Sequence, residues 1–324
     1  MGQIAVSGKD GLRLFGQTIP RFITDAGPNA ARRFVEFFTA NIRNRNTREA
    51  YARAAVGFCR WCEDKRVRLS SVQPVHVAAY VEELGTKFAK PSVKQHLAAI
   101  RMLCDFLVVG QILPTNPAAS VRGPRYVSKR GKTPVLSPED ARHLLESIDC
   151  STVLGLRDRA LIGVMVYSFA RISAVTGMDV ADYYQNGKRC WLRLHEKGGK
   201  FHEVPVHHKA EEYLDAYVEK AGLSSCAKTP LFRTIPGKRG TITEHRLNRR
   251  EALKVIKRRS EAAGLSSKIG NHTFRATGIT TYLLNGGSLE NAQAIAGHES
   301  PRTTKLYDRT TDEITLEEVE RIRL

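Results

Sequence analysis

The sequence predicts a mainly helical protein of two domains, with a small antiparallel β-sheet in the second domain. The first observation is length: the chain has 324 residues, and one domain typically takes about 150 residues. The second is a series of segments whose apolar residues follow the helical period of 3.6. The third is a stretch at residues 190–206 in which apolar and polar residues alternate, as they do in paired strands.

Composition restricts the partner more than the fold. The chain carries 51 Lys and Arg against 33 Asp and Glu, a formal charge of +18, with an ordinary hydrophobic share of 42%. Disordered, collagen-like and coiled-coil proteins are thereby excluded. So large a positive charge favours a polyanionic partner, first nucleic acid and second an anionic membrane surface.

A membrane role fits poorly. The most apolar stretch, Leu161–Ala170, is followed directly by Arg171 and is shorter than the roughly 20 residues that a spanning helix needs. The first twenty residues resemble no signal peptide. The six cysteines are scattered unevenly, which does not suggest a disulfide framework. We therefore expect a cytoplasmic protein with reduced thiols.

The first domain is expected at residues 25–121, after an irregular segment at residues 1–24 that is rich in glycine. Apolar residues on one broad face predict its first helix, and Thr47 is a candidate N-cap for its second. Its expected helices are Ala30–Ile42, Thr47–Asp64, Pro74–Leu84 and Ser92–Val108.

A basic linker follows at residues 122–134. Its cations are Arg122, Arg125, Lys129, Arg130 and Lys132, with no acid between the first and the last of them. An extended basic segment can follow the phosphates of a DNA groove. A solvated run of charge is the alternative, and we expect these five residues to contact DNA.

The second domain is expected at residues 135–310 and begins with a strong helix start, Ser137 as N-cap with Pro138 in the first turn. Further expected helices are Leu156–Ala170, Lys209–Ala221, Thr243–Ala263, Thr273–Leu284 and a short one near Asn291. The expected strands are Cys190–Leu194 and Glu203–Val206.

Six residues of the second domain stand out as candidates for chemistry. His272 and Arg275 lie three apart at a helix start, so they can reach one anion together. Gly297 permits a tight turn that should expose His298. Tyr307 follows nine residues later, while Arg171 ends a buried helix and Lys197 lies between the two strands.

These six residues match, in type and order, the pattern of a known protein family. From about residue 25 to residue 320 the chain is similar to tyrosine recombinases of the phage integrase family, in a two-domain form resembling the bacterial Xer recombinases. The matching positions, in the family's order, are Arg171, Lys197 in Glu196-Lys197-Gly198-Gly199-Lys200, His272 and Arg275 of the H-x-x-R box, His298 after Gly297, and Tyr307. Phe169-Ala170 stands where Gly-Leu is common before the first arginine.

The resemblance implies a fold and a reaction. Residues 25–121 would be a SAM-like core-binding domain and residues 135–310 a mixed α+β catalytic domain, together forming a clamp around DNA. Tyr307 would attack a phosphodiester, giving a 3′-phosphotyrosyl intermediate and, after strand exchange, a Holliday junction. No metal, ATP or other cofactor would be needed. The partners would be double-stranded DNA sites, three further copies in a tetramer, and a related recombinase or an accessory protein.

The chemistry explains these residue types. Two guanidiniums, Arg171 and Arg275, can hold the non-bridging oxygens of the phosphate and stay charged at any physiological pH. His272 would assist proton removal or hold an oxygen, and His298 would hydrogen-bond the phosphate. Lys197 would protonate the departing 5′ oxygen, although Lys200 in the same turn could take that role.

Two other clusters could bind metal. Cys59 and Cys62 form a single C-x-x-C pair inside a helical pattern, and His195, His202, His207 and His208 surround the hairpin. The cysteine pair lacks a second pair at the spacing of a zinc ribbon, so we expect packing cysteines. For the histidines we expect positions at the edge of the sheet or facing DNA, without a metal.

The last segment, residues 311–324, is expected to be a tail helix. It holds five acids against two bases, and Leu316, Val319 and Ile322 recur on one face. An apolar stripe on one face of a helix needs an apolar groove in which it can be buried. The tail packs on its own domain or, as the resemblance suggests, on a neighbouring protomer.

Two rival functions remain at this stage. A non-catalytic DNA-binding protein could retain the scaffold, although the full set of six residues argues against that. A type IB topoisomerase-like enzyme would use similar chemistry to relax supercoils without a partner site.

Overall fold

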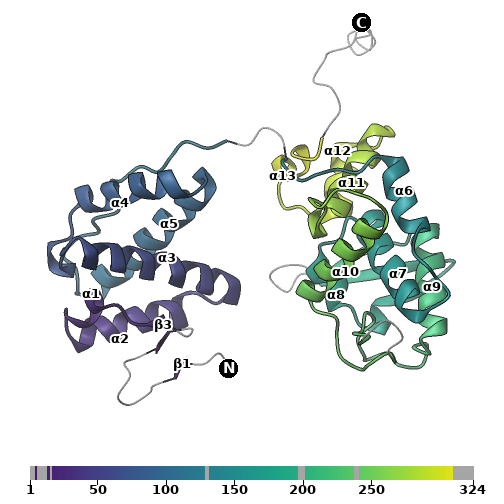
Figure 1. Ribbon diagram of the computed structural model, residues 1–324, viewed down its shortest axis with the longest axis horizontal. Helices are drawn as coiled ribbons and strands as arrows, with labels where there is room; N and C mark the ends of the chain where they lie inside the picture. The colour runs from purple at the N-terminus through teal and green to yellow at the C-terminus, as the bar shows by residue number, and fades with distance from the viewer. Residues whose placement is uncertain are drawn as a thin grey trace, which may run out of the picture. The chain divides into compact units, whose positions relative to one another are not determined.

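The computed structural model describes residues 4–5, 13–14, 17–127, 131–195, 201–236 and 241–308. The chain divides into two compact units, Met1–Val127 and Ser128–Leu324, coloured purple to blue and teal to yellow in Figure 1. The division falls inside the segment 122–134 that the sequence indicates as a linker.

The first unit is built from helices. Its longer elements are α2 (Pro28–Glu36), continued by a π-helical turn η1 (Phe37–Asn41), then α3 (Arg45–Asp64), α4 (Pro74–Lys87) and α5 (Lys90–Val109). The four helices expected from periodicity are therefore confirmed, within a few residues at each end. Asn44, and not Thr47, caps α3, because the Asn44 Oδ1 atom accepts a hydrogen bond from the Thr47 backbone N–H at 3.1 Å.

The expectation of an irregular N-terminal segment is wrong in part. Three short strands, β1 (Ile4–Ala5), β2 (Arg13–Leu14) and β3 (Gln17–Thr18), pair antiparallel in that order. The short helix α1 (Arg21–Thr24) follows and packs against α3. Strands of two residues are too short to show the alternation by which strands are recognised in a sequence.

The core of the first unit is aromatic. Phe34, Phe37 and Phe38 are fully buried, and the rings of Phe34 and Phe38 meet edge to face with centroids 5.2 Å apart. Cys59 and Cys62 are buried in the same core. Burial raises the pKa of Cys62 to about 12, so both residues act as apolar packing groups, as expected.

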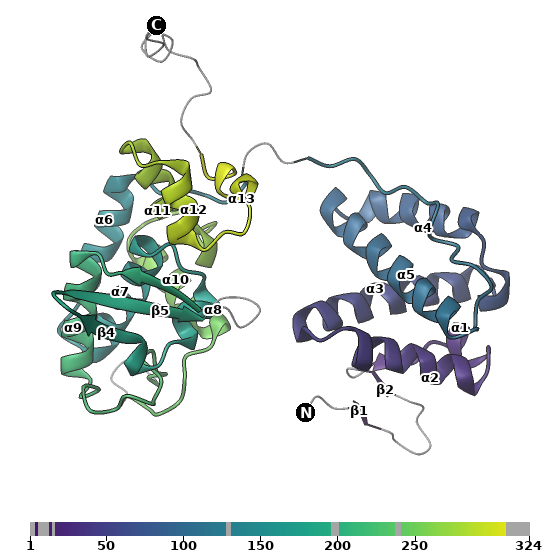
Figure 2. The same cartoon turned by 180° about the vertical axis from the view of Figure 1, so that it is seen from behind.

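The second unit combines helices with one sheet (Figure 2). Its helices are α6 (Pro138–Glu146), α7 (Val153–Tyr167), α8 (Ile172–Gly177), α9 (His208–Lys220), α10 (Arg249–Ala262), α11 (Asn271–Leu284), α12 (Leu289–Ala296) and α13 (Pro301–Lys305). The Ser137 cap is confirmed, because the Ser137 Oγ atom accepts from the Asp140 backbone N–H at 3.0 Å. Helix α10 begins six residues later than expected, because Arg246 still pairs with Arg233 in a β-bridge.

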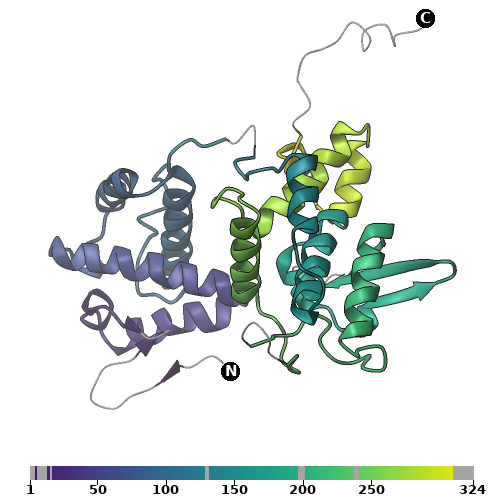
Figure 3. The same cartoon turned by 45° about the vertical axis from the view of Figure 1, so that its right-hand side comes forward.

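The sheet lies at one edge of this unit (Figure 3). Its strands are β4 (Tyr183–Asn186), β5 (Arg189–His195) and β6 (Phe201–Pro205), antiparallel and in sequence order. The expected pair of strands is confirmed, with Leu192 opposite Val204. The sequence did not indicate β4, whose four residues show no apolar alternation.

Helix α7 is the centre of the second unit. Ala160, Leu161, Ile162 and Val164 are fully buried on all its sides, while α9 and α11 pack against it. In the part of the chain that the structure describes, no helix is both long and apolar enough to cross a membrane.

Candidate active site

Arg275 lies on α11 and is almost completely buried, with 2% of its surface exposed. Its Nη1 atom donates to the Phe169 carbonyl oxygen, and its Nη2 atom donates to the Ala296 carbonyl oxygen at 2.7 Å. These bonds tie α11 to the segments before Arg171 and before His298. A neutral carbonyl orients a guanidinium without cancelling its charge.

Arg171 is the half-buried residue that precedes the first turn of α8. Two residues earlier Phe169 adopts a left-handed backbone, with φ of 53°. Glycine takes that conformation freely, whereas a bulky residue does so with strain. Phe169 therefore occupies a backbone conformation that favours glycine.

His272 lies in the first turn of α11, as expected, where part of its side chain is covered by the protein and the rest stays accessible to solvent. Its pKa is lowered by partial burial and, second, by the positive charges of Arg275 and Arg171. The same two arginines act on His298. Both arginines therefore lie near both histidines, and the four side chains come from three segments of the second unit.

The expectation that the turn exposes His298 is wrong. Gly297 does adopt the left-handed conformation that the turn requires, with φ of 57°, but only 7% of His298 is exposed. Its Nδ1 atom lies 2.8 Å from the Thr304 Oγ1 atom. Burial, together with Arg275 and Arg171, lowers the pKa of His298 to about 4, so its imidazole is neutral at physiological pH.

Tyr307 is half-buried just after α13. Its ring stacks on His298, with centroids 5.8 Å apart and an angle of 7° between the planes. Its carbonyl oxygen accepts a bond from the Thr280 Oγ1 atom of α11 at 2.8 Å. The tyrosine is thus held beside His298, on a segment fastened to the helix that carries Arg275.

The two predicted lysines and part of the linker lie outside the described residues: Lys197, Lys200, Lys129 and Arg130. Of the other linker cations, Arg122, Arg125 and Lys132 are exposed. Arg125 lines a small pocket of about 190 Å³ together with Lys94 and Arg101 of α5. The predicted tail helix, residues 311–324, is likewise outside the described part.

The sequence pattern did not single out Thr304, because its role depends on the fold. A threonine three residues before a tyrosine carries no signal of its own. It gains a role only because the turn at Gly297 brings the His298 ring onto α13.

The histidines near the hairpin serve separate contacts. His195 Nε2 lies 3.1 Å from the Asp182 Oδ2 atom, whereas His202 Nε2 lies 2.9 Å from the Ile295 carbonyl oxygen. His207 stacks on Tyr167, with ring centroids 4.3 Å apart. Within the described ranges no three metal-ligating side chains gather at one point.

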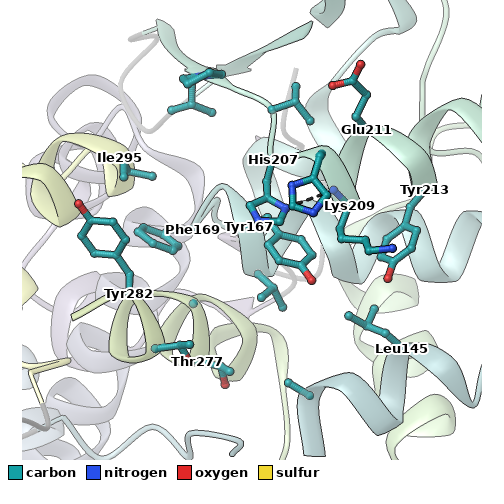
Figure 4. A pocket seen from close by; sticks show the side chains of 18 of the residues that line it. Leu145, Tyr167, Phe169, His207, Lys209, Glu211, Tyr213, Thr277, Tyr282 and Ile295 are labelled. Atoms are coloured by element: carbon teal, nitrogen blue, oxygen red, sulfur yellow. Dashed lines mark hydrogen bonds between the residues drawn. The ribbon is translucent and has the colours of Figure 1, made fainter. Parts of the chain in front are cut away.

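A groove of about 840 Å³ lies elsewhere on the second unit, bounded by α6, α7, α9, β6 and α11. In Figure 4 the apolar side chains of Phe169 and Ile295 lie on one side of this groove, and His207 and Lys209 lie on the other. Its lining includes four cationic side chains and two carboxylates: Arg142, Lys188, Arg189 and Lys209 against Glu146 and Glu211. The groove therefore combines apolar side chains with an excess of cations.

Comparisons with known proteins identify the family of the chain. The phage integrase family pattern matches residues 134–313, and its N-terminal SAM-like domain matches residues 32–110. The chain is 31% identical over 254 residues to "Tyrosine recombinase XerC" of Myxococcus xanthus, covering 76% of this chain and 81% of that protein. It is 32% identical over 230 residues to the protein of that name from Chlamydia muridarum, covering 70% and 69%.

Solved structures share the fold at lower identity. XerH recombinase bound to its difH substrate superposes with a TM-score of 0.65 at 19% identity, covering 85% of this chain and 78% of that one. A lambda integrase tetramer bound to a Holliday junction gives 0.66 at 16% identity, covering 88% and 79%. The chain therefore belongs to the phage integrase family and is a tyrosine recombinase, an enzyme that cleaves and rejoins DNA at specific sites.

Proposed function

We propose that the enzyme cleaves one DNA strand by attack of the Tyr307 hydroxyl oxygen on a phosphorus atom. The new bond joins that oxygen to the 3′ phosphate, the bond to the 5′ oxygen breaks, and the leaving oxygen takes up a proton. Because the phosphotyrosyl bond conserves the free energy of the phosphodiester, rejoining needs neither ATP nor a metal ion.

One observation carries the proposal: Tyr307 stacks on His298, whose turn is bonded to Arg275. The nucleophile, a hydrogen-bond donor and a guanidinium thus converge on one place. Attack creates additional negative charge on the non-bridging oxygens, and cations aimed at that position lower the barrier. Arg275 and Arg171 supply these cations.

The histidines have distinct roles in this proposal. His298 is neutral, so it contributes a hydrogen bond and not a charge. His298 Nδ1 lies 2.8 Å from the Thr304 hydroxyl; we assign the hydroxyl as the donor in this bond, so that Nε2 bears the hydrogen that is donated to the phosphate. His272, exposed at the start of α11, receives the tyrosine proton or holds a second oxygen. Lys197 delivers a proton to the departing 5′ oxygen, with Lys200 as the alternative donor.

DNA affinity comes from the basic surface. Arg122, Arg125 and Lys132 are exposed, and with Lys129 and Arg130 they follow the phosphates of the bound duplex. Contacts of this kind make binding steeply dependent on salt.

Strand exchange requires several protomers. The lambda integrase superposed above is a tetramer on a Holliday junction, and we propose the same assembly and intermediate here. The groove, which is lined by apolar side chains and an excess of cations, suits the tail at residues 311–324, which combines an apolar stripe with a net charge of −3 (five acids, two bases). A tail placed in a neighbour's groove couples the active sites of the tetramer.

The proposed function is tested with a nicked suicide substrate, which traps the covalent intermediate because the cleaved fragment diffuses away. The wild type should form a protein–DNA adduct without metal or ATP, and Tyr307→Phe should form none. Tyr282→Phe, another half-buried tyrosine of this unit, is the matched control and should form the adduct. An adduct that persists in Tyr307→Phe contradicts the mechanism, and relaxation of supercoils without any exchange between two sites contradicts the recombination.

A further inference from the structure

The last turn of α12 shows how the Gly-His segment of the active site is held in place. The final four carbonyl groups of a helix lack partners within the helix and need other donors. In α12 these carbonyls belong to Gln293, Ala294, Ile295 and Ala296. Each of them has an identified donor.

Two of the four are satisfied locally. The Gly297 backbone N–H donates to the Ala294 carbonyl oxygen, and the His298 N–H donates to that of Gln293, each at 3.1 Å. This is the bonding that a left-handed glycine at a helix C-terminus produces. It fixes the shape of the turn but not its position against the rest of the unit.

The other two carbonyls are bonded from distant segments. Arg275 Nη2 donates to the Ala296 carbonyl oxygen at 2.7 Å. His202 Nε2, on strand β6, lies 2.9 Å from the Ile295 carbonyl oxygen, 93 residues away in sequence. A carbonyl can only accept, so the hydrogen is on His202 Nε2 and His202 donates.

The His202 ring also packs against the turn. A Cβ atom at Gly297 would lie 3.4 Å from His202 Cδ2 and 3.6 Å from Cγ, which is ordinary contact. The imidazole therefore lies directly against the turn to which it is hydrogen-bonded. The strand that carries it pairs Leu194 opposite His202, so the ring is fixed to the sheet.

We propose that His202 is a positioning residue of the active site, which ties β6 to the C-terminus of α12 and so sets the place of His298 beside Arg275 and Tyr307. The inference rests on the proposed function, since the contribution of His298 to cleavage is part of that proposal. His202 touches no reacting atom in this account and acts only through the turn.

Three substitutions at one position test it by single-turnover cleavage of the suicide substrate. His202→Phe keeps the ring and removes the donor, and cleavage should slow by about 10- to 100-fold, the usual result of misplacing a catalytic group. Gln places an amide N–H near the original Nε2 position, so His202→Gln should stay within about threefold of wild type. Asn is one methylene shorter, and His202→Asn should be as slow as His202→Phe.

Controls separate positioning from folding and binding. His143→Phe makes the same change at an exposed histidine of α6 and should leave cleavage unchanged. The DNA dissociation constant should be the same in all variants. In a His298→Ala background, His202→Phe should slow cleavage by less than about twofold, because coupled residues are not additive. Equal slowing in both backgrounds, or failure of Gln to restore the rate, overturns the inference.

A second measurement does not depend on catalysis. In wild type the pKa of His298 is held at about 4 by burial and by Arg275 and Arg171. When the turn loosens in His202→Phe, that pKa should rise toward the ordinary value of about 6.5, as followed by NMR of labelled histidine. If the pKa of His298 is the same in His202→Phe as in wild type, the inference is wrong. This outcome does not depend on cleavage, whereas a wild type that forms no adduct would refute the proposed function itself.

Discussion

Two groups of arginines in the second unit are held by different kinds of partner. At the junction of α7 and α10, the Asp158 carboxylate is fully buried and accepts from three guanidiniums: Arg157 Nη2 at 2.6 Å, Arg258 Nη2 at 2.8 Å and Arg259 Nε at 2.9 Å. In the active site, backbone carbonyls of Phe169 and Ala296 hold Arg275.

The difference separates structural from chemical arginines. A carboxylate neutralises the cation it binds, and removing one member of a buried pair costs much free energy. A backbone carbonyl orients the cation and carries no net charge of its own. The first group should therefore determine stability and the second the rate of cleavage, and each can be changed separately.

The largest expected effect is on stability. Asp158→Asn leaves Arg157 buried without a counter-charge, and the free energy of unfolding should fall by about 3–5 kcal/mol, measured by urea denaturation. Cleavage per folded molecule should be unchanged. The matched control is Asp179→Asn at the exposed pair with Arg246, which should cost less than about 1 kcal/mol. Equal losses at the two sites would refute the structural role of Asp158.

The converse change is Arg275→Lys. Lysine keeps the charge but loses the planar guanidinium that contacts two carbonyls and a phosphate at once, so cleavage should slow by about 100-fold, or about 3 kcal/mol in the barrier. Rapid-quench cleavage assays measure the rate, and a gel-shift titration checks that DNA binding persists. A rate near wild type would show that charge alone suffices.

The dependence of stability on pH follows from His298. Its pKa of about 4 in the folded protein lies below the ordinary value, so the unfolded chain binds a proton more readily. The contribution of neutral His298 to the free energy of unfolding is present above about pH 6.5 and is lost as the pH falls toward 4. Between pH 7 and pH 5 the free energy of unfolding should fall by about 2 kcal/mol from this cause. Urea denaturation at both pH values should show a smaller change in His298→Gln. Identical changes would mean that His298 is not buried as described.

The smallest expected effect concerns the partner of His298. Thr304→Val preserves shape and removes the hydroxyl beside His298 Nδ1, at a cost of about 1 kcal/mol in the free energy of unfolding. Thr303→Val, at the half-buried neighbouring threonine, is the control and should cost less. If the two variants are equally stable, the bond to His298 contributes nothing.

Local patterns predicted most of the helices, because periodicity and caps depend on neighbours in sequence. Ser137 is an example, since its cap is formed within three residues. Strand β4 does not stand out in the sequence because its four residues show no apolar alternation, and α10 begins later than its pattern indicates because Arg246 pairs with Arg233.

The site divides in the same way. Arg171, His272, Arg275, His298 and Tyr307 follow from motif order, and charge and ring contacts relate them in space. The burial of His298 could not be predicted, because it requires Thr304 and Tyr307 to fold over the turn. In the sequence His202 stands out only as one of a cluster of histidines. Its hydrogen bond to the Ile295 carbonyl oxygen could not be predicted, because Ile295 lies far away in sequence.

The most direct test of the central claim is the chemical identity of the covalent linkage. Wild-type protein trapped on the suicide substrate is digested with protease and nuclease, and the modified peptide is sequenced by mass spectrometry. The account predicts a nucleotide joined through its 3′ phosphate to Tyr307, and a DNA fragment ending in a 5′ hydroxyl. A nucleotide on any other residue, or a linkage through a 5′ phosphate, would contradict it.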